Sequence, residues 1–175
     1  MATPIDEDLD EIIFGSQSAG PHPDLEALME QYKLFVETSE RLVARRQVVN
    51  TFFLSANALA LSALGVIAKE ASHSPLAAIG IVAISVAALL LCVAWKRLVR
   101  SYAQLNSGKF AVIERLERRL PAALFRAEWA ALGEGDCHEV YKPFTATEKL
   151  VSVVFIYLYG LAASVTVGWL VVSYL

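Results

Sequence analysis

The chain has 175 residues, of which 56% are hydrophobic and 19% are charged, and its formal net charge at pH 7 is -3. Its apolar residues gather in three uncharged runs, at residues 48–68, 76–95 and 150–175. A bilayer core about 30 Å thick needs about 20 such residues in a helix. The percentage alone would also suit a soluble domain, but the arrangement in long blocks argues against one, because a soluble domain spreads its apolar residues over short amphipathic stretches.

Residues 1–23 are predicted to form a disordered acidic tail. Five acidic residues fall in the first eleven positions, and a segment rich in Gly, Ser and Pro follows them. Such a composition buries too little apolar surface to offset the entropy of ordering. We expect the tail to aid solubility or, alternatively, to act as a regulatory or partner-binding segment.

A long helix is predicted next, with a cytoplasmic part at residues 24–47 that continues into the first span at 48–68. Asp24 can act as its N-cap, and neither Gly nor Pro occurs between Leu25 and Leu64. Apolar residues recur at intervals of three and four in the first part, as in an amphipathic helix.

The second span is predicted at residues 76–95 and a cytoplasmic helical region at 96–147. A third span follows at 148–175, and Thr145 and Glu148 have the spacing of a capping box at its start. The fold class is therefore all-α, a three-span helical membrane protein whose long helices extend into a cytoplasmic helical collar.

Basic residues are distributed unevenly around these spans. Of the 15 Lys and Arg residues, four precede the first span, ten lie between the second and third, and only Lys69 lies in the first loop. The positive-inside rule then places the N-terminus and residues 96–149 in the cytoplasm, and the C-terminus on the other side.

No catalytic constellation is recognisable in the sequence. The three histidines fall in different segments, and Cys137 with His138 lacks the second ligand pair that tetrahedral zinc requires. Phosphate-binding loops and hydrolase motifs are not found either. We therefore expect no enzyme activity, no cofactor and no metal, and the sequence contains no evident nucleic-acid binding signal.

Polar residues within the first span form the first candidate site. Asn50 and Asn57 lie seven residues apart, on one face of a helix, and an amide that faces lipid is costly without a partner. They could bond to other helices, within one chain or across an oligomer. Alternatively, they could line a water-filled path together with Thr51, Ser55 and Ser62.

Small residues recur every four positions in the third span, at Gly160, Ser164 and Gly168. This spacing lets helix backbones approach closely. The pattern fits an internal packing groove or a contact between copies of the chain.

Basic residues that flank the first two spans form a second candidate site, a ring beneath the inner leaflet: Arg45, Arg46, Lys96, Arg97 and Arg100. Such a ring usually binds lipid phosphate and sets the depth of the helices. If copies of the chain surround an axis, the same ring would form a site for an anion or a nucleotide phosphate.

Several ordered motifs resemble a known family. They are Arg45-Arg46-Gln47 with Asn50-Thr51-Phe52-Phe53-Leu54, Trp95-Lys96-Arg97-Leu98 with Ser101-Tyr102, Leu105-Asn106, Lys109-Phe110, Leu120-Pro121, Glu128-Trp129, Gly133-Glu134-Gly135, and Tyr141-Lys142-Pro143-Phe144-Thr145 with Glu148. They are similar to motifs of the RipA family of small octameric bacterial inner-membrane proteins, over roughly residues 28–165. The resemblance implies a homo-oligomer with eight copies, and it carries no biochemical activity to named residues.

The architecture is more loosely similar to SLATT-type membrane effectors, which are proposed to form pores in defence systems, although the third span departs from a two-span pattern. We therefore predict an oligomeric protein of the bacterial inner membrane that acts as a pore or channel-like effector, in a defence or stress system. The alternative is a non-conducting scaffold that organises lipid or partner proteins. The expected partners are membrane lipids, other copies of the chain, and an unidentified cytoplasmic protein or small ligand.

Overall fold

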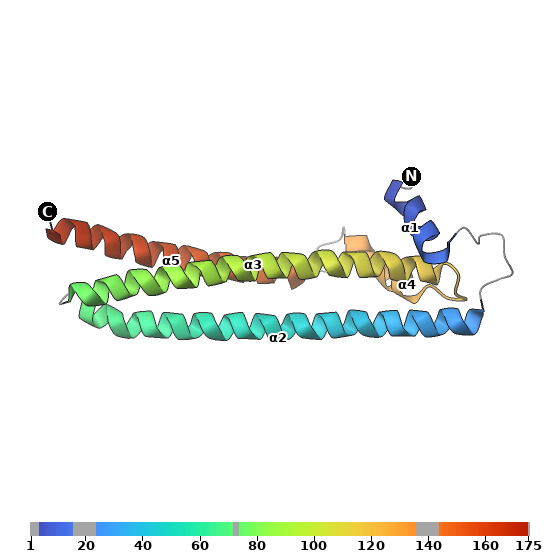
Figure 1. Cartoon of the computed structure of the whole chain (residues 1–175), viewed down its shortest axis with the longest axis horizontal. Coiled ribbons are helices and arrows are strands. Elements are labelled where there is room, and N and C mark those ends of the chain that lie inside the picture. Colours follow the sequence, from blue (N-terminus) through green and yellow to red (C-terminus); the bar gives the residue numbers. More distant parts are fainter. Residues whose placement is uncertain (1–3, 16–23, 72–73, 136–143, 175) are drawn as a thin grey trace. The chain divides into compact units, whose positions relative to one another are not determined.

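The computed structural model describes residues 4–15, 24–71, 74–135 and 144–174. In chain order (Figure 1), the elements are α1 (Pro4–Phe14), α2 (Leu25–Ala71), α3 (Pro75–Glu117), α4 (Leu124–Ala131), the short 3-10 helix η1 (Gly133–Gly135) and α5 (Phe144–Tyr174). Within these residues there is no β-strand, and this confirms the predicted all-α class.

Three of the helices are long and apolar enough to cross a membrane, as judged by length and composition. The qualifying segments are Leu25–Lys69 in α2, Pro75–Glu117 in α3 and Thr147–Ser173 in α5. The prediction of a three-span helical protein is thereby confirmed. Helix α2 runs without interruption through both the amphipathic residues 25–47 and the first apolar run.

The chain divides into two compact units, to which α2 and α3 both contribute. The polar unit comprises residues 1–43 and 104–142, and the span unit comprises residues 44–103 and 143–175. The span unit includes all three apolar runs, so it is the part of the chain that would lie in the membrane.

The core of the span unit consists of side chains from α2, α3 and α5. One cluster joins Leu64, Cys92 and Tyr159 with neighbouring aliphatic side chains. A second cluster is aromatic: the Phe53 and Trp95 rings stack with centroids 5.7 Å apart and planes 4° apart. Each of the three long helices therefore buries one face against the other two.

Glu117 organises the core of the polar unit. Its carboxylate is buried, and it accepts hydrogen bonds from the Tyr32 hydroxyl (2.9 Å) and from the backbone amides of Phe125 (2.9 Å) and Arg126 (3.2 Å). Those two amides belong to the first turn of α4, where helix amides lack intrahelical partners. Glu117 thus fixes α4 against α2 and α3 within this unit.

Two local predictions differ from the structure. Residues 4–14, expected to be part of a disordered tail, form α1, whose Asp10 and Phe14 contact Arg115 and Arg119. Helix α5 begins at Phe144, so that Thr145 lies inside the helix and is not its N-cap.

Candidate functional site

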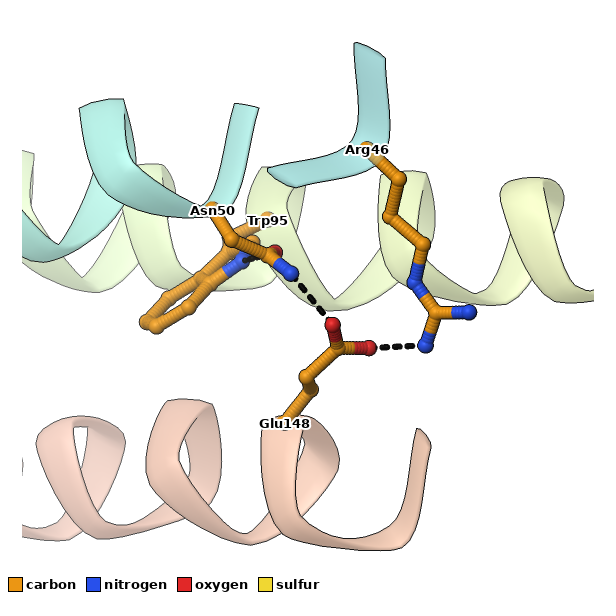
Figure 2. A network of polar contacts seen from close by, with 4 residues as sticks. All are labelled: Arg46, Asn50, Trp95 and Glu148. Carbon is orange, nitrogen blue, oxygen red and sulfur yellow. Dashed lines mark hydrogen bonds and ion pairs between the residues drawn. The ribbon is translucent and has the colours of Figure 1, made fainter. Parts of the chain in front are cut away.

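A buried carboxylate lies near the start of α5, in the span unit. Glu148 is 7% exposed, and its two oxygens accept hydrogen bonds from the Arg46 guanidinium and the Asn50 side-chain amide, both on α2. The Asn50 side-chain oxygen in turn accepts a bond from the Trp95 indole N–H on α3, at 2.8 Å. Figure 2 shows how these four side chains connect α2, α3 and α5.

The geometry of this network follows from the local sequence. Arg46 and Asn50 lie four residues apart, about one helical turn, so both side chains face α5. The Trp95 ring is held by its stacking contact with Phe53, which orients the indole N–H toward Asn50. The packing of the helices therefore brings four side chains together near the ends of the apolar runs: Arg46, Asn50, Trp95 and Glu148.

The electrostatic consequence is a strong mutual dependence of Arg46 and Glu148. Their side chains are 15% and 8% exposed, so each charge has lost most of its hydration. A buried charge is tolerated only with an opposite charge and further hydrogen bonds, and removal of one partner is strongly destabilising. The pair therefore locks the start of α5 to α2.

A second buried network surrounds Asn57. Its side-chain NH2 donates to the Phe53 carbonyl (2.7 Å), and its side-chain oxygen accepts from the Cys92 thiol (3.1 Å). The Tyr159 hydroxyl donates to the Asn57 backbone carbonyl at 3.0 Å. Both asparagines of the first span therefore have hydrogen-bond partners inside the chain.

The three hydroxyl residues of the same span lie on another face. Thr51, Ser55 and Ser62 are exposed, whereas Asn57 is fully buried. At about 100° per residue, the hydroxyls are separated from Asn50 and Asn57 by roughly 100–160° around α2. The five predicted polar residues thus form two groups, one buried inside the chain and one on its surface.

The five predicted basic residues also divide. Arg46 belongs to the buried network, whereas Arg45, Lys96, Arg97 and Arg100 are exposed in the span unit. Their exposure leaves these four cations accessible to lipid phosphate or to another anion.

The small residues of α5 have open space beside them. A Cβ atom added at Gly160 or Gly168 would meet no atom within 4 Å, and Ser164 is exposed while its hydroxyl donates to the Gly160 carbonyl at 2.8 Å. Within the part of the chain that the structure describes, then, no other helix backbone approaches these two glycines closely.

Sequence reasoning missed the roles of Glu148, Trp95, Cys92 and Tyr159. The sequence predicts a capping box for Glu148, and Trp95 enters the sequence analysis only as part of a family motif. The sequence does contain one signal for this network, which is the position of each residue relative to its apolar run. Arg46 precedes the first run, Trp95 ends the second and Glu148 precedes the third, so three successive spans would place all three residues at the same side of the membrane. Pairing between them depends on helix rotation, which the pattern of apolar residues leaves open.

Among the residues that the structure describes, no group of three His, Cys, Asp or Glu side chains could hold a metal ion. Cys137 and His138, which the sequence analysis considered, lie outside the described residues.

Comparison with known proteins identifies the group to which this architecture belongs. No curated protein and no solved structure matches the chain. The model of the octameric membrane protein family (8xMP) matches residues 29–168, which include most of α2, all of α3 and α4, and most of α5. The chain therefore belongs to the octameric membrane protein family, and it is an oligomeric membrane protein.

Proposed function

We propose that copies of this chain form a ring in which α2 lines a water-filled path across the membrane, and that the assembly acts as a pore or channel-like effector. The observation that carries this proposal is an exposed stripe of small and hydroxyl-bearing residues along α2, here called the α2 stripe: Thr51, Ser55, Ala58, Ser62 and Gly65. At about 100° per residue these five positions lie within an arc of roughly 80°.

The face on one side of the α2 stripe carries large apolar residues instead of small ones. Phe52 and Leu59 are 62% and 73% exposed, and large apolar side chains such as these suit contact with lipid tails. The α2 stripe offers neither their bulk nor their apolar area. In a symmetric ring the same stripe from every copy would face one axis, which would give a lining of small side chains with three hydroxyls from each copy.

A non-conducting scaffold is the second candidate, and one observation favours it. Thr51 donates to the Gln47 carbonyl at 3.0 Å, and Ser62 donates to the Ala58 carbonyl at 2.9 Å. Hydroxyls that bond to their own helix backbone are tolerated in a lipid environment without water. The α2 stripe could then pack against a neighbouring copy with no aqueous path between them.

Thiol accessibility in the reconstituted assembly separates the two candidates. The background variant carries Cys92→Ala and Cys137→Ser, which remove the native thiols. Into it, Ser55→Cys and Ser62→Cys are introduced one at a time as test variants. Phe52→Cys and Leu59→Cys are the matched controls on the neighbouring apolar face. A charged, water-soluble thiol reagent should react at Ser55→Cys and Ser62→Cys and reduce ion flux from liposomes. It should react far more slowly at the two controls.

The control for assembly is the mass of each variant in nanodiscs. Equal reaction at all four positions, or no flux from confirmed oligomers under any condition, would contradict the proposed pore and leave the scaffold.

We also propose that the protein resides in the bacterial inner membrane with its N-terminus in the cytoplasm. The support is the distribution of charge, because exposed Arg97 and Arg100 follow the second span whereas Lys69 is the basic residue near the first loop. A membrane-impermeant thiol reagent added to intact spheroplasts should label Lys69→Cys and leave Arg100→Cys unlabelled. The reverse pattern would invert the topology.

A further inference from the structure

Helix α1 contacts the rest of the polar unit at the end of α3 and at the segment that follows α3. The Asp10 carboxylate lies 3.4 Å from the Arg115 guanidinium. The Arg119 guanidinium carbon lies 3.4 Å from the centroid of the Phe14 ring, a cation-π geometry. Ile13, which lies between Asp10 and Phe14 in the sequence, lines one edge of a groove.

The groove itself is open and mainly apolar. Its volume is about 360 Å³, and Leu34, Phe35, Val112 and Leu116 line it together with Ile13. Leu34 is 59% exposed, so α1 covers the groove only in part. Displacement of α1 would therefore expose a larger apolar surface in this unit.

Opposite charges contribute to the contact between α1 and the end of α3. The helix has five acidic and no basic residues, and it contacts a segment that carries Arg115, Arg118 and Arg119. Attraction of this kind is screened when the Debye length falls from about 10 Å at 0.1 M salt to about 3 Å at 1 M.

The individual contacts are weak. The Asp10 side chain is 45% exposed, and exposed ion pairs contribute little to stability. An eleven-residue helix is also marginal in water by itself, so α1 depends on its docking contacts to remain folded. Docking and helix formation are thus expected to be lost together.

We propose that α1 is a releasable strap whose docking on the polar unit is controlled by charge. Docked, it contacts Arg115 and lines one edge of the apolar groove. Released, by raised ionic strength or by neutralisation of Asp10, it leaves the groove lined by Phe35 and Leu116 more exposed. The strap is independent of whether the assembly conducts, and it supplies a reversible way to change the exposed apolar area of this unit.

Millisecond hydrogen exchange on the full-length oligomer tests the strap. The test variants are Asp10→Asn and Phe14→Ala, each of which removes one docking contact. Glu11→Gln and Ile12→Ala are their matched controls, since both residues are exposed on the same helix and make the same kinds of change. Amides of residues 25–43 in α2 report whether the polar unit remains folded.

The strap predicts that amides of α1 exchange at least several-fold faster in both test variants, while the two controls stay close to the wild type. Raised salt should accelerate exchange of α1 in the wild type and have a smaller effect in Asp10→Asn. Unchanged protection in Asp10→Asn and Phe14→Ala would overturn the strap. So would exchange of α1 at unfolded-chain rates in the wild type at low salt, because α1 would then not be docked.

Discussion

At the scale of single residues, the buried carboxylate of Glu148 has the largest consequence for stability. Its partners, Arg46 and Asn50, come from a helix that precedes it by about 100 residues, so the network forms only when the helices are packed. Asn57 shows the same principle deeper in the span unit, where Cys92 and Tyr159 satisfy it. Polar residues in this part of the chain therefore specify how the helices are rotated.

The ion pair makes a quantitative prediction. Glu148→Leu and Arg46→Met, each made singly, should destabilise the span unit by about 3–5 kcal/mol, because each leaves one buried charge without its opposite. The double variant should cost less than either single change. Unfolding of the detergent-solubilised protein measures all three.

The exposed pair Arg41 with Glu37, at 2.7 Å, is the control for this cycle, and its removal should change stability by about 0–1 kcal/mol. Additive effects of the two single changes at Arg46 and Glu148 would contradict the assigned pairing.

At the scale of elements, α4 illustrates how one side chain holds a helix. No residue of α4 is buried, and the helix is held through the bonds from its first turn to Glu117 and through ring contacts of Phe125 with Tyr32 and Phe110. Glu117 also accepts from Tyr32, so its carboxylate joins α4 to α2 beside the ring contact of Phe125 with Tyr32.

The Tyr32 hydroxyl gives this unit a pH dependence. Burial, followed by the hydrogen bond to Glu117 and its negative charge, raises the pKa of Tyr32 to about 12. A folded-state pKa above the unfolded value means that the contribution of this group is fully present below about pH 10 and is lost as pH rises through about 12.

Stability of the polar unit should therefore fall between about pH 10 and 12, and Tyr32→Phe should reduce this fall. Denaturant unfolding followed at α4 measures it. An equal fall in the wild type and in Tyr32→Phe would show that other groups are responsible.

At the scale of the whole molecule, the three spans expose many large apolar side chains that lipid or another copy of the chain must cover. Large apolar residues on all three long helices are exposed in the single chain, among them Leu59, Leu90 and Val172. Lipid can cover some of these faces, and membership of an octameric family means that neighbouring copies cover others. Assembly is therefore part of how this chain satisfies its surface.

The open glycines of α5 provide a test of which face meets a neighbour. Because an added Cβ at Gly160 or Gly168 meets nothing within 4 Å, Gly160→Leu and Gly168→Leu should leave the single chain folded. If close backbone approach occurs between copies here, both changes should lower the fraction of octamer in nanodiscs several-fold. Native mass measurement gives the fraction of octamer for each variant. Leu161→Ile is the control, because Leu161 is on the same helix and is 64% exposed. An unchanged octamer would place the subunit contacts elsewhere.

The sequence by itself determined the helical class and the three spans of this protein, because long uncharged apolar runs can satisfy their backbone in lipid only as helices. It also singled out Arg46, Asn50 and Asn57. Only the tertiary structure decided which polar residues meet, because pairing of Arg46 with Glu148 depends on how each helix is rotated. The same holds for α1, whose acidic composition indicates disorder and whose folding depends on the arginines it contacts.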